Sequence, residues 1–296
     1  GTKAIVAGAV NDIELYRKLI DSGVSDYVTP PFTASKIQNA ISKLYPNSRS
    51  EHSKSIAFLG VKGGVGSSIL AQNTAYYAAN SLGEKTIALD FDLSFGTCGI
   101  NFDIASKSSF SDLIQKTEQI DELLVERTIE RVSENLSILA LYDSPSNNID
   151  SLSEKYVNII ECSKKLSSLV VIDLKNTASA EATDVLRYVD EIVLVAEPNL
   201  ANLRNAITWK RHLNDLRGDA GNLHLVLNKL SENPRNTLSE ADFKRMSGMA
   251  ACSLIPLEPD TFLKSEEINL PAVASSPNSK ASKEIILFIQ NLISKN

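Results

Sequence analysis

The sequence predicts an α/β fold, with a mostly parallel sheet flanked by helices and a smaller α/β piece at the N-terminus. Of its 296 residues, 43% are hydrophobic and 22% charged, an ordinary composition for a globular chain. From residue 56 onward, short and nearly continuous apolar runs alternate with helical stretches. This pattern is typical of parallel strands that are buried on both faces.

Residues 1–46 are predicted to form a small piece in the order β-α-β-α. Lys3–Val10 is an apolar run that predicts a buried strand, and the apolar spacing of Asp12–Ser22 predicts a helix. Asp26–Thr29 predicts a short strand, and Ala34–Leu44 predicts a second helix. The polar residues 47–55 are predicted to be a linker, so we expect a domain boundary there.

Residues 56–296 are predicted to form one large domain on seven buried strands. The runs that predict these strands are Ile56–Gly60, Thr86–Asp90, Leu136–Ala140, Leu169–Asp173, Ile192–Ala196, Leu223–Asn228 and Ala251–Ile255. Helical patterns include Ile69–Ser81 and Leu203–Leu213, and the second carries Trp209 as a core or interface residue. The amphipathic tail Lys283–Ser294 lacks the basic face of a surface anchor, so we expect it to pack back on the domain.

The bulk properties exclude several classes of protein. A net charge of −6 argues against strong nonspecific binding to nucleic acid, although a local basic patch stays open. The three cysteines lie far apart and outside any Cys/His cluster, which predicts reduced thiols and gives no zinc motif. No apolar run approaches the roughly 20 residues that cross a bilayer. We therefore expect a cytoplasmic protein with no specific nucleic-acid partner.

A glycine-rich loop joins the strand Ile56–Gly60 to the helix that follows it. The loop comprises Val61, Lys62, Gly63, Gly64, Val65, Gly66, Ser67 and Ser68. Successive glycine N–H groups form an anion-binding concavity, and the positive end of the next helix faces the phosphates. We expect this loop to bind the phosphates of ATP, with the Ser68 hydroxyl on Mg²⁺. The alternative is a tight glycine turn that binds no ligand.

Carboxylates follow two of the predicted strands. Asp90 and Asp92 come at the end of Thr86–Asp90, and Asp173 ends Leu169–Asp173. Open α/β sheets bind ligands at the carboxyl ends of their strands, so these side chains are candidates to contact a bound ligand. For Asp90 and Asp92, a turn or helix-capping pair is the alternative interpretation.

The segment Lys62-Gly63-Gly64-Val65-Gly66 resembles the deviant phosphate-binding loop of the MinD/ParA family of ATPases. One departure is that Ser67 stands where such loops usually carry a closing lysine. The resemblance implies that Lys62 reaches across a dimer interface to the phosphates bound by a second copy. ATP binding would then be coupled to dimerisation.

The same resemblance assigns roles to further residues. It implies that Asp92 and Lys62 are catalytic, and that Ser68, Asp90 and Asp173 serve the metal. It also implies that Asn228 binds the base through its amide, which offers both a donor and an acceptor, and that Pro256 flanks the base.

Residues 3–44 resemble the last part of a response-regulator receiver domain. The match lies in Asp26-Tyr27-Val28-Thr29-Pro30-Pro31-Phe32, where Pro30 replaces the lysine that senses a phosphoryl group. With the loop that lacks its lysine and the segment Leu238–Lys244, this resembles the TadZ/CpaE-like branch of pilus assembly proteins. We expect an incomplete, atypical receiver-like domain that is not phosphorylated; an unrelated βαβα cap is the alternative.

The resemblance implies ATP and Mg²⁺ as cofactors and a homodimer formed through the nucleotide face. It also implies partners in the pilus and secretion machinery, with peripheral association at the inner membrane face of a cell pole. Because the loop lacks one charge clamp, we expect at most weak ATP hydrolysis. The main alternative is a ParA/MinD-type partitioning or positioning ATPase that cycles by hydrolysis on DNA or membrane. A tyrosine kinase with a related loop, and an interaction protein that has lost nucleotide binding, are further alternatives.

Overall fold

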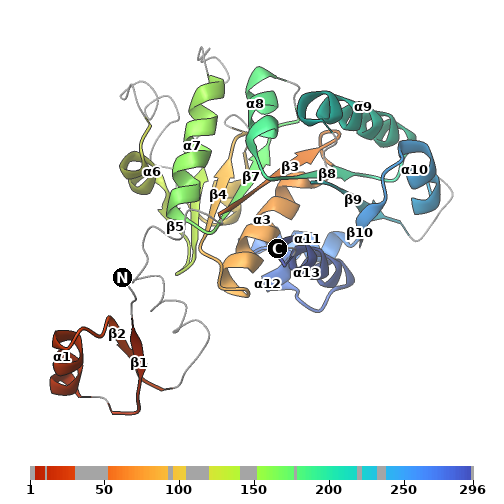
Figure 1. Cartoon of the computed structure of the whole chain (residues 1–296). Coiled ribbons are helices and arrows are strands. Elements are labelled where there is room, and N and C mark those ends of the chain that lie inside the picture. The colour runs from red at the N-terminus through yellow and green to blue at the C-terminus, as the bar shows by residue number, and fades with distance from the viewer. Residues whose placement is uncertain are drawn as a thin grey trace. The chain divides into compact units, whose positions relative to one another are not determined.

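The computed structural model describes residues 4–10, 12–30, 53–92, 96–104, 120–140, 152–176, 179–218, 222–231 and 238–294. The chain divides into two compact units, Gly1–His52 and Ser53–Asn296, which are described separately (Figure 1). The predicted helix Ala34–Leu44 and residues 47–52 of the predicted linker lie outside the described residues. The last linker residues, Lys54 and Ser55, already belong to a strand of the second unit.

The described part of the first unit is a β-α-β arrangement. Its elements are β1 (Ile5–Ala7), α1 (Ile13–Asp21) and β2 (Asp26–Val28). The strands pair in parallel, and Asp12 caps the helix by accepting a hydrogen bond of 2.7 Å from the Glu14 N–H. The prediction of a buried strand over Lys3–Val10 needs correction, because β1 is shorter and its residues are half-buried or exposed. A two-stranded sheet covers β1 on one edge only.

The second unit is built on an eight-stranded sheet in the order β10-β9-β8-β3-β7-β4-β6-β5. The strands are β3 (Lys54–Gly60), β4 (Thr86–Asp90), β5 (Glu130–Arg131), β6 (Leu136–Ala140), β7 (Leu169–Leu174), β8 (Glu191–Ala196), β9 (Leu223–Leu230) and β10 (Ala251–Pro256). All neighbours pair in parallel except β5, which runs antiparallel to β6. Each predicted strand is present within two residues, so the predicted α/β fold with a mostly parallel sheet is confirmed.

Helices cover both faces of this sheet (Figure 1). They are α3 (Ser67–Asn80), α4 (Cys98–Asn101), α6 (Glu122–Thr128), α7 (Leu152–Leu166), α8 (Ala180–Tyr188), α9 (Leu200–Arg217), α10 (Glu240–Ser247), α11 (Pro259–Glu267), α12 (Ala272–Ser275) and α13 (Lys280–Ile293). Buried side chains of α7, α8, α9 and α10 form one core layer with the sheet, and those of α3, α12 and α13 form the other. Among the described residues, no helix has the length and apolar character needed to span a bilayer.

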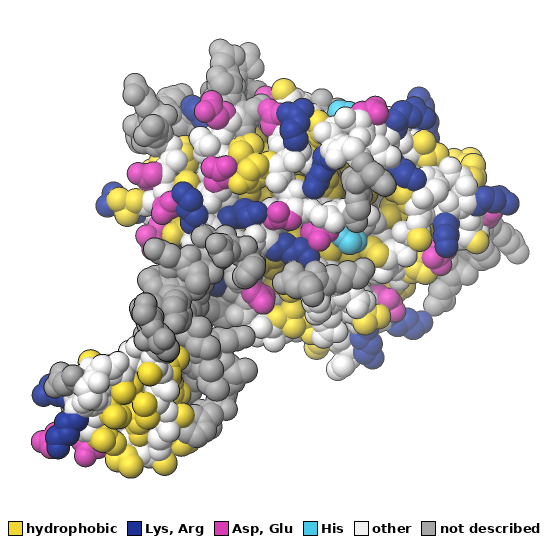
Figure 2. Space-filling view, in the orientation of Figure 1, with side chains coloured by type: hydrophobic (Ala, Val, Ile, Leu, Met, Phe, Trp, Pro, Cys, Tyr) yellow, Lys and Arg dark blue, Asp and Glu magenta, His cyan; other side chains and the backbone are white. Residues whose placement is uncertain are grey.

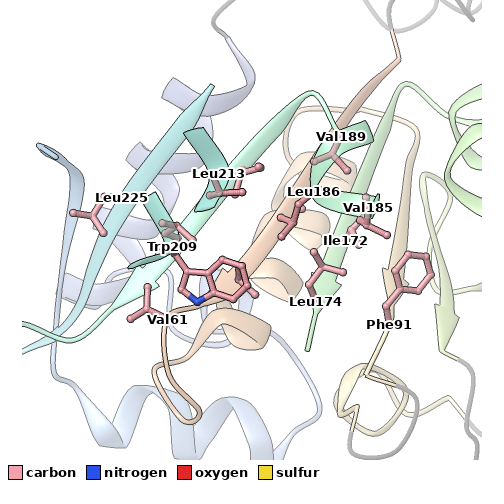
Figure 3. Packing of buried hydrophobic residues seen from close by; sticks show 14 of the residues in the cluster. Val61, Phe91, Ile172, Leu174, Val185, Leu186, Val189, Trp209, Leu213 and Leu225 are labelled. Atoms are coloured by element: carbon pink, nitrogen blue, oxygen red, sulfur yellow. The ribbon is translucent and has the colours of Figure 1, made fainter. Parts of the chain in front are cut away.

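The strand β3 shows why the apolar runs are continuous. Ala57 and Leu59 belong to the core layer under α7–α10, whereas Ile56 and Phe58 belong to the layer under α3 and α13. All four are fully buried, as expected for a central strand that has helices on both sides. Figure 3 shows the first of these layers, including Trp209, whose predicted place in a core or interface is confirmed as core.

The C-terminal helix α13 packs against β10 and α3. Its buried face includes Ile285, Phe288 and Ile289, which join the core layer of α3. The prediction that this tail packs back on the domain is therefore confirmed. At its end, the Leu292 carbonyl accepts a hydrogen bond of 2.9 Å from Lys54 Nζ at the start of β3.

Candidate functional site

The glycine-rich loop leaves the carboxyl end of β3 and enters α3 without an intervening segment. Gly64 and Gly66 have φ of 80° and 94°, in the left-handed region that L side chains rarely adopt. A Cβ added at Gly66 would also lie 2.5 Å from Asn228 Nδ2. The backbone at position 66 therefore requires glycine for its conformation and for its close approach to β9.

Two buried valines anchor the loop in the two core layers. Val61 lies in the layer of α7–α10 and Val65 in that of α3, and both are 2% exposed (Val61 is labelled in Figure 3). Between them, Lys62, Gly63 and Gly64 are exposed. The loop thus has two fixed ends and presents the backbone between them to solvent.

The end of β9 holds the second half of the loop through its carbonyl groups. Asn228 Nδ2 donates to the Val65 carbonyl at 2.8 Å, and Lys229 Nζ donates to the Gly64 carbonyl. Lys229 also forms an ion pair of 2.9 Å with Glu197 Oε1. Its φ of 58° is unusual for a residue with a side chain and costs of order 1 kcal/mol.

The segment after β7 holds the first half of the loop through its N–H groups. Asn176 Oδ1 accepts from the N–H groups of Lys62 at 3.2 Å and Gly63 at 3.1 Å, while its Nδ2 donates to the Gly60 carbonyl at 3.1 Å. This orientation of the amide is assigned from its neighbours, because the opposite one places oxygen against oxygen. Asn205 on α9 adds a bond of 3.0 Å from its Nδ2 to the Val61 carbonyl.

Two buried carboxylates lie side by side at the carboxyl ends of β4 and β7. Asp90 and Asp173 are register partners in these neighbouring strands and are 4% and 6% exposed. The Ser68 hydroxyl in the first turn of α3 hydrogen-bonds the Asp173 side chain. Asp90 accepts from the N–H groups of Cys98 and Asp92, both at 3.1 Å. The sheet register therefore brings together two of the predicted metal ligands, and Ser68 is the third.

Burial sets the protonation behaviour of this pair. The pKa of Asp173 is raised to about 8, mainly by desolvation and also by the charge of Asp90, while the hydrogen bond from Ser68 opposes the shift. Desolvation also raises the pKa of Asp90 to about 6, against the lowering effect of its backbone hydrogen bonds. Both shifts mean that two negative charges here are unfavourable without a cation close by.

The other predicted site residues lie around this centre. Asp92 is half-buried, and its Oδ1 lies 3.6 Å from Lys175 Nζ. Pro256 ends β10 beside Leu230, at the same edge of the sheet as Asn228. The Lys62 side chain is exposed and forms no ion pair with any residue in the described ranges. The structure thus brings the loop, the serine, the carboxylates and Asn228 together but leaves the Lys62 side chain apart.

Sequence reasoning missed Asn176, Lys229 and Asn205. Each contacts a loop backbone atom that is more than 100 residues away in the sequence. Lys229 directly follows a predicted strand and Asn176 lies three residues after the end of another, which is the one signal that could have marked them as candidates.

No protein-family model matches the sequence, and no curated protein matches it significantly. Solved structures do match. A ParA family ATPase from Chlorobium tepidum has a TM-score of 0.72 and 19% identity, over 80% of this chain and 98% of its own. The septum site-determining protein MinD from Pyrococcus horikoshii, complexed with Mg-ADP, has a TM-score of 0.70 and 19% identity, over 82% and 96%. An ATP complex of a McdA variant from Cyanothece has a TM-score of 0.64 and 12% identity, over 82% and 96%.

These comparisons show that the chain has the fold of the MinD and ParA ATPases. The shares of this chain that they cover correspond to the length of the second unit. At such low identity the likeness is one of fold, so the chemistry of the site has to be argued from its own residues.

Proposed function

We propose that the chain binds ATP·Mg²⁺ in the glycine-rich loop and uses the bound nucleotide to control its self-association. One observation carries this proposal: the Ser68 hydroxyl is hydrogen-bonded to Asp173 beside the buried Asp90, at the point where the loop enters α3. A tight turn without a ligand gives no reason for two adjacent buried carboxylates. A bound cation does, because it neutralises them.

The residues present fit a magnesium ion. The described residues contain no cluster of three His, Cys, Asp or Glu side chains able to hold a metal. Mg²⁺ does not need such a cluster, because it is usually bound by one or two protein oxygens together with substrate phosphates and waters. In the proposal Ser68 and Asp173 hold the ion and Asp90 supports its water shell. The ion supplies charge neutralisation at the phosphates when it is bound.

The loop has few positively charged side chains, which favours a role in binding ATP over a role in hydrolysing it. Ser67 occupies the position of the closing lysine, and Lys229 brings a positive charge to the Gly64 carbonyl instead. Asp92 is proposed to orient the attacking water, but phosphoryl transfer depends on charge clamps at the phosphates. We therefore expect slow turnover. A rate above about 1 s⁻¹, within the range of competent phosphoryl-transfer enzymes, would favour a partitioning or positioning ATPase that cycles by hydrolysis.

We extend the proposal to Lys62 as the residue that senses a second copy. Its side chain is exposed on the loop, as a contact to phosphates across a dimer requires. On the face drawn in Figure 2, Lys and Arg side chains of the second unit are interspersed with Asp and Glu side chains. Such a mixture on a chain of net charge −6 favours a protein partner over the phosphate backbone of DNA.

The finer assignment is also part of this proposal: a TadZ/CpaE-like scaffold for pilus assembly at the inner membrane face of a cell pole. It is supported by the receiver-like segment at Asp26–Pro30 and by Leu238–Lys244, where Ser239 caps α10. The proposed partners are proteins of the pilus and secretion machinery. In this assignment the first unit is the end of a receiver-like domain, and the second unit is the ATP-binding domain.

The test combines calorimetric titration with sedimentation. The wild-type chain is expected to bind ATP·Mg²⁺ and to form dimers only with ATP present. Lys62→Ala should still bind ATP but stay monomeric, whereas Lys264→Ala, which changes an exposed lysine of α11, should behave as wild type. Absence of ATP binding in the wild type would refute the proposed function, and dimerisation of Lys62→Ala would refute the role of Lys62.

A further inference from the structure

Asn176 makes three hydrogen bonds to the backbone of the loop from a single side chain. It donates to the Gly60 carbonyl and accepts from the N–H groups of Lys62 and Gly63. These two N–H groups lie on the exposed part of the loop, and Asn176 is itself exposed. Its amide can therefore leave the loop without opening a cavity in either core layer.

The N–H groups that Asn176 binds lie beside the segment that follows β7, the strand that carries Asp173. Asn176 follows Asp173 by three residues, and Asp173 is bonded to Ser68. Ser68 and Asp173 would hold the Mg²⁺ of a bound nucleotide close to its outer phosphates, so the terminal phosphoryl group belongs on this side of the loop. Its oxygens accept hydrogen bonds from the same kind of donors as the Asn176 oxygen does.

We propose that Asn176 is a specificity-determining residue of the nucleotide site, because its side-chain oxygen and the terminal phosphoryl group of a triphosphate compete for the N–H groups of Lys62 and Gly63. This inference rests on the proposed binding of ATP in the loop. A diphosphate, which ends one phosphoryl group earlier, leaves the Asn176 contacts in place. A triphosphate displaces them, so residue 176 takes different positions with the two nucleotides.

Competition and simple stabilisation of the loop predict different changes in nucleotide affinity when the side chain is removed. If the side chain only stabilised the loop, its removal would weaken the binding of both nucleotides. A competing side chain instead weakens the binding of the triphosphate. Its removal therefore strengthens triphosphate binding and leaves diphosphate binding unchanged. Two neutral hydrogen bonds between exposed groups correspond to about a three- to tenfold change in affinity.

The experiment measures the dissociation constants of ATP and ADP, each with Mg²⁺, for the full chain and two variants of Asn176. Asn176→Ala is expected to bind ATP about three- to tenfold more tightly and ADP with unchanged affinity. Asn176→Asp keeps an acceptor on the two N–H groups and adds a negative charge, so ATP should bind more than about tenfold more weakly. The binding of ADP to this variant should be weakened less. Thermal unfolding of each variant confirms that it is folded.

Asn205→Ala is the matched control, because it also removes an asparagine bond to the loop. That bond goes to the Val61 carbonyl and occupies no N–H donor. This variant should bind both nucleotides equally or more weakly, and should not favour ATP. If Asn176→Ala weakens ATP and ADP alike, or leaves both unchanged, the inference about Asn176 is overturned while the proposed function stands. If the wild type binds neither nucleotide, both are overturned.

Discussion

The two halves of the glycine-rich loop are held by opposite backbone groups. In the second half, Asn228 and Lys229 bind the carbonyls of Val65 and Gly64, and in the first half, Asn176 binds the N–H groups of Lys62 and Gly63. Contacts to carbonyls leave the N–H groups of the second half available for an anion. The second half is therefore preorganised for phosphate, whereas the first half has to exchange one partner for another.

The largest effect should come from Gly66 in the preorganised half. Gly66→Ala forces a side chain into a left-handed conformation and against Asn228, so we expect a loss of about 2–4 kcal/mol in the free energy of unfolding and no measurable ATP binding. Gly63→Ala is the control in the other half, because a Cβ there meets no atom within 4 Å. Urea denaturation measures the free energy of unfolding of both variants. Equal stability would contradict the argument that the backbone conformation and close contact at position 66 require glycine.

A second prediction concerns the buried carboxylates at the ends of β4 and β7. The pKa of Asp173 is raised in the folded state, so the folded protein holds its proton more tightly and loses stability as pH rises from about 4 towards 8. In Mg²⁺-free buffer at pH 8.5, Asp173→Asn should therefore be about 1–3 kcal/mol more stable than the wild type. At pH 5 the difference should shrink, because the wild-type carboxyl is then protonated. A difference that does not depend on pH would count against this explanation.

A substitution of Asn228 tests the contacts that fix the second half of the loop without changing a glycine. Asn228→Ala removes the bond to the Val65 carbonyl and leaves a buried acceptor without its partner, which should cost about 1–2 kcal/mol of stability. ATP and ADP should both bind more weakly, in contrast to the result expected for Asn176→Ala. Chemical denaturation and nucleotide titration test this, and selective weakening of ATP would show that the two halves do not differ as described.

The smallest effect is expected for the charge that Lys229 brings to the loop. Lys229→Gln keeps a hydrogen-bond donor but removes the cation, so ATP affinity should fall several-fold, and more at low salt than at high salt. Ser67→Lys restores a lysine at its usual place in such loops and should recover the affinity in the Lys229→Gln background. Failure of this rescue, with both variants folded, would mean that Lys229 only braces the loop.

The fold could be predicted from the sequence because its signal is local. Strands such as β4 and β6 begin and end at the predicted residues, since a central parallel strand requires an uninterrupted apolar run. The edge strand β5 was missed because it has only two residues, both charged and neither buried. The strand β1 was predicted to be too long, since apolar residues near it lie outside any broad sheet.

The candidate site could be predicted only in part. The glycines, the serine after them and the aspartates at strand ends could be recognised, because they lie within the loop or directly at the ends of predicted strands. Local sequence alone therefore marks them. Asn176 and Lys229 contact the loop through side chains that the fold brings in from β7 and β9, and no spacing in the sequence encodes such contacts. Asparagine and lysine are also common at strand ends for other reasons, so their types alone do not mark them.

The bond between Lys54 and the Leu292 carbonyl has a consequence for engineering. It places the start and the finish of the second unit next to each other, so a short linker between residues 294 and 53 would close this unit into a ring. Such a ring could be reopened at the exposed turn around Gly83, between α3 and β4, to give a circular permutant with new termini. Reporter groups could then be attached at this turn while the strand that leads into the glycine-rich loop remains continuous.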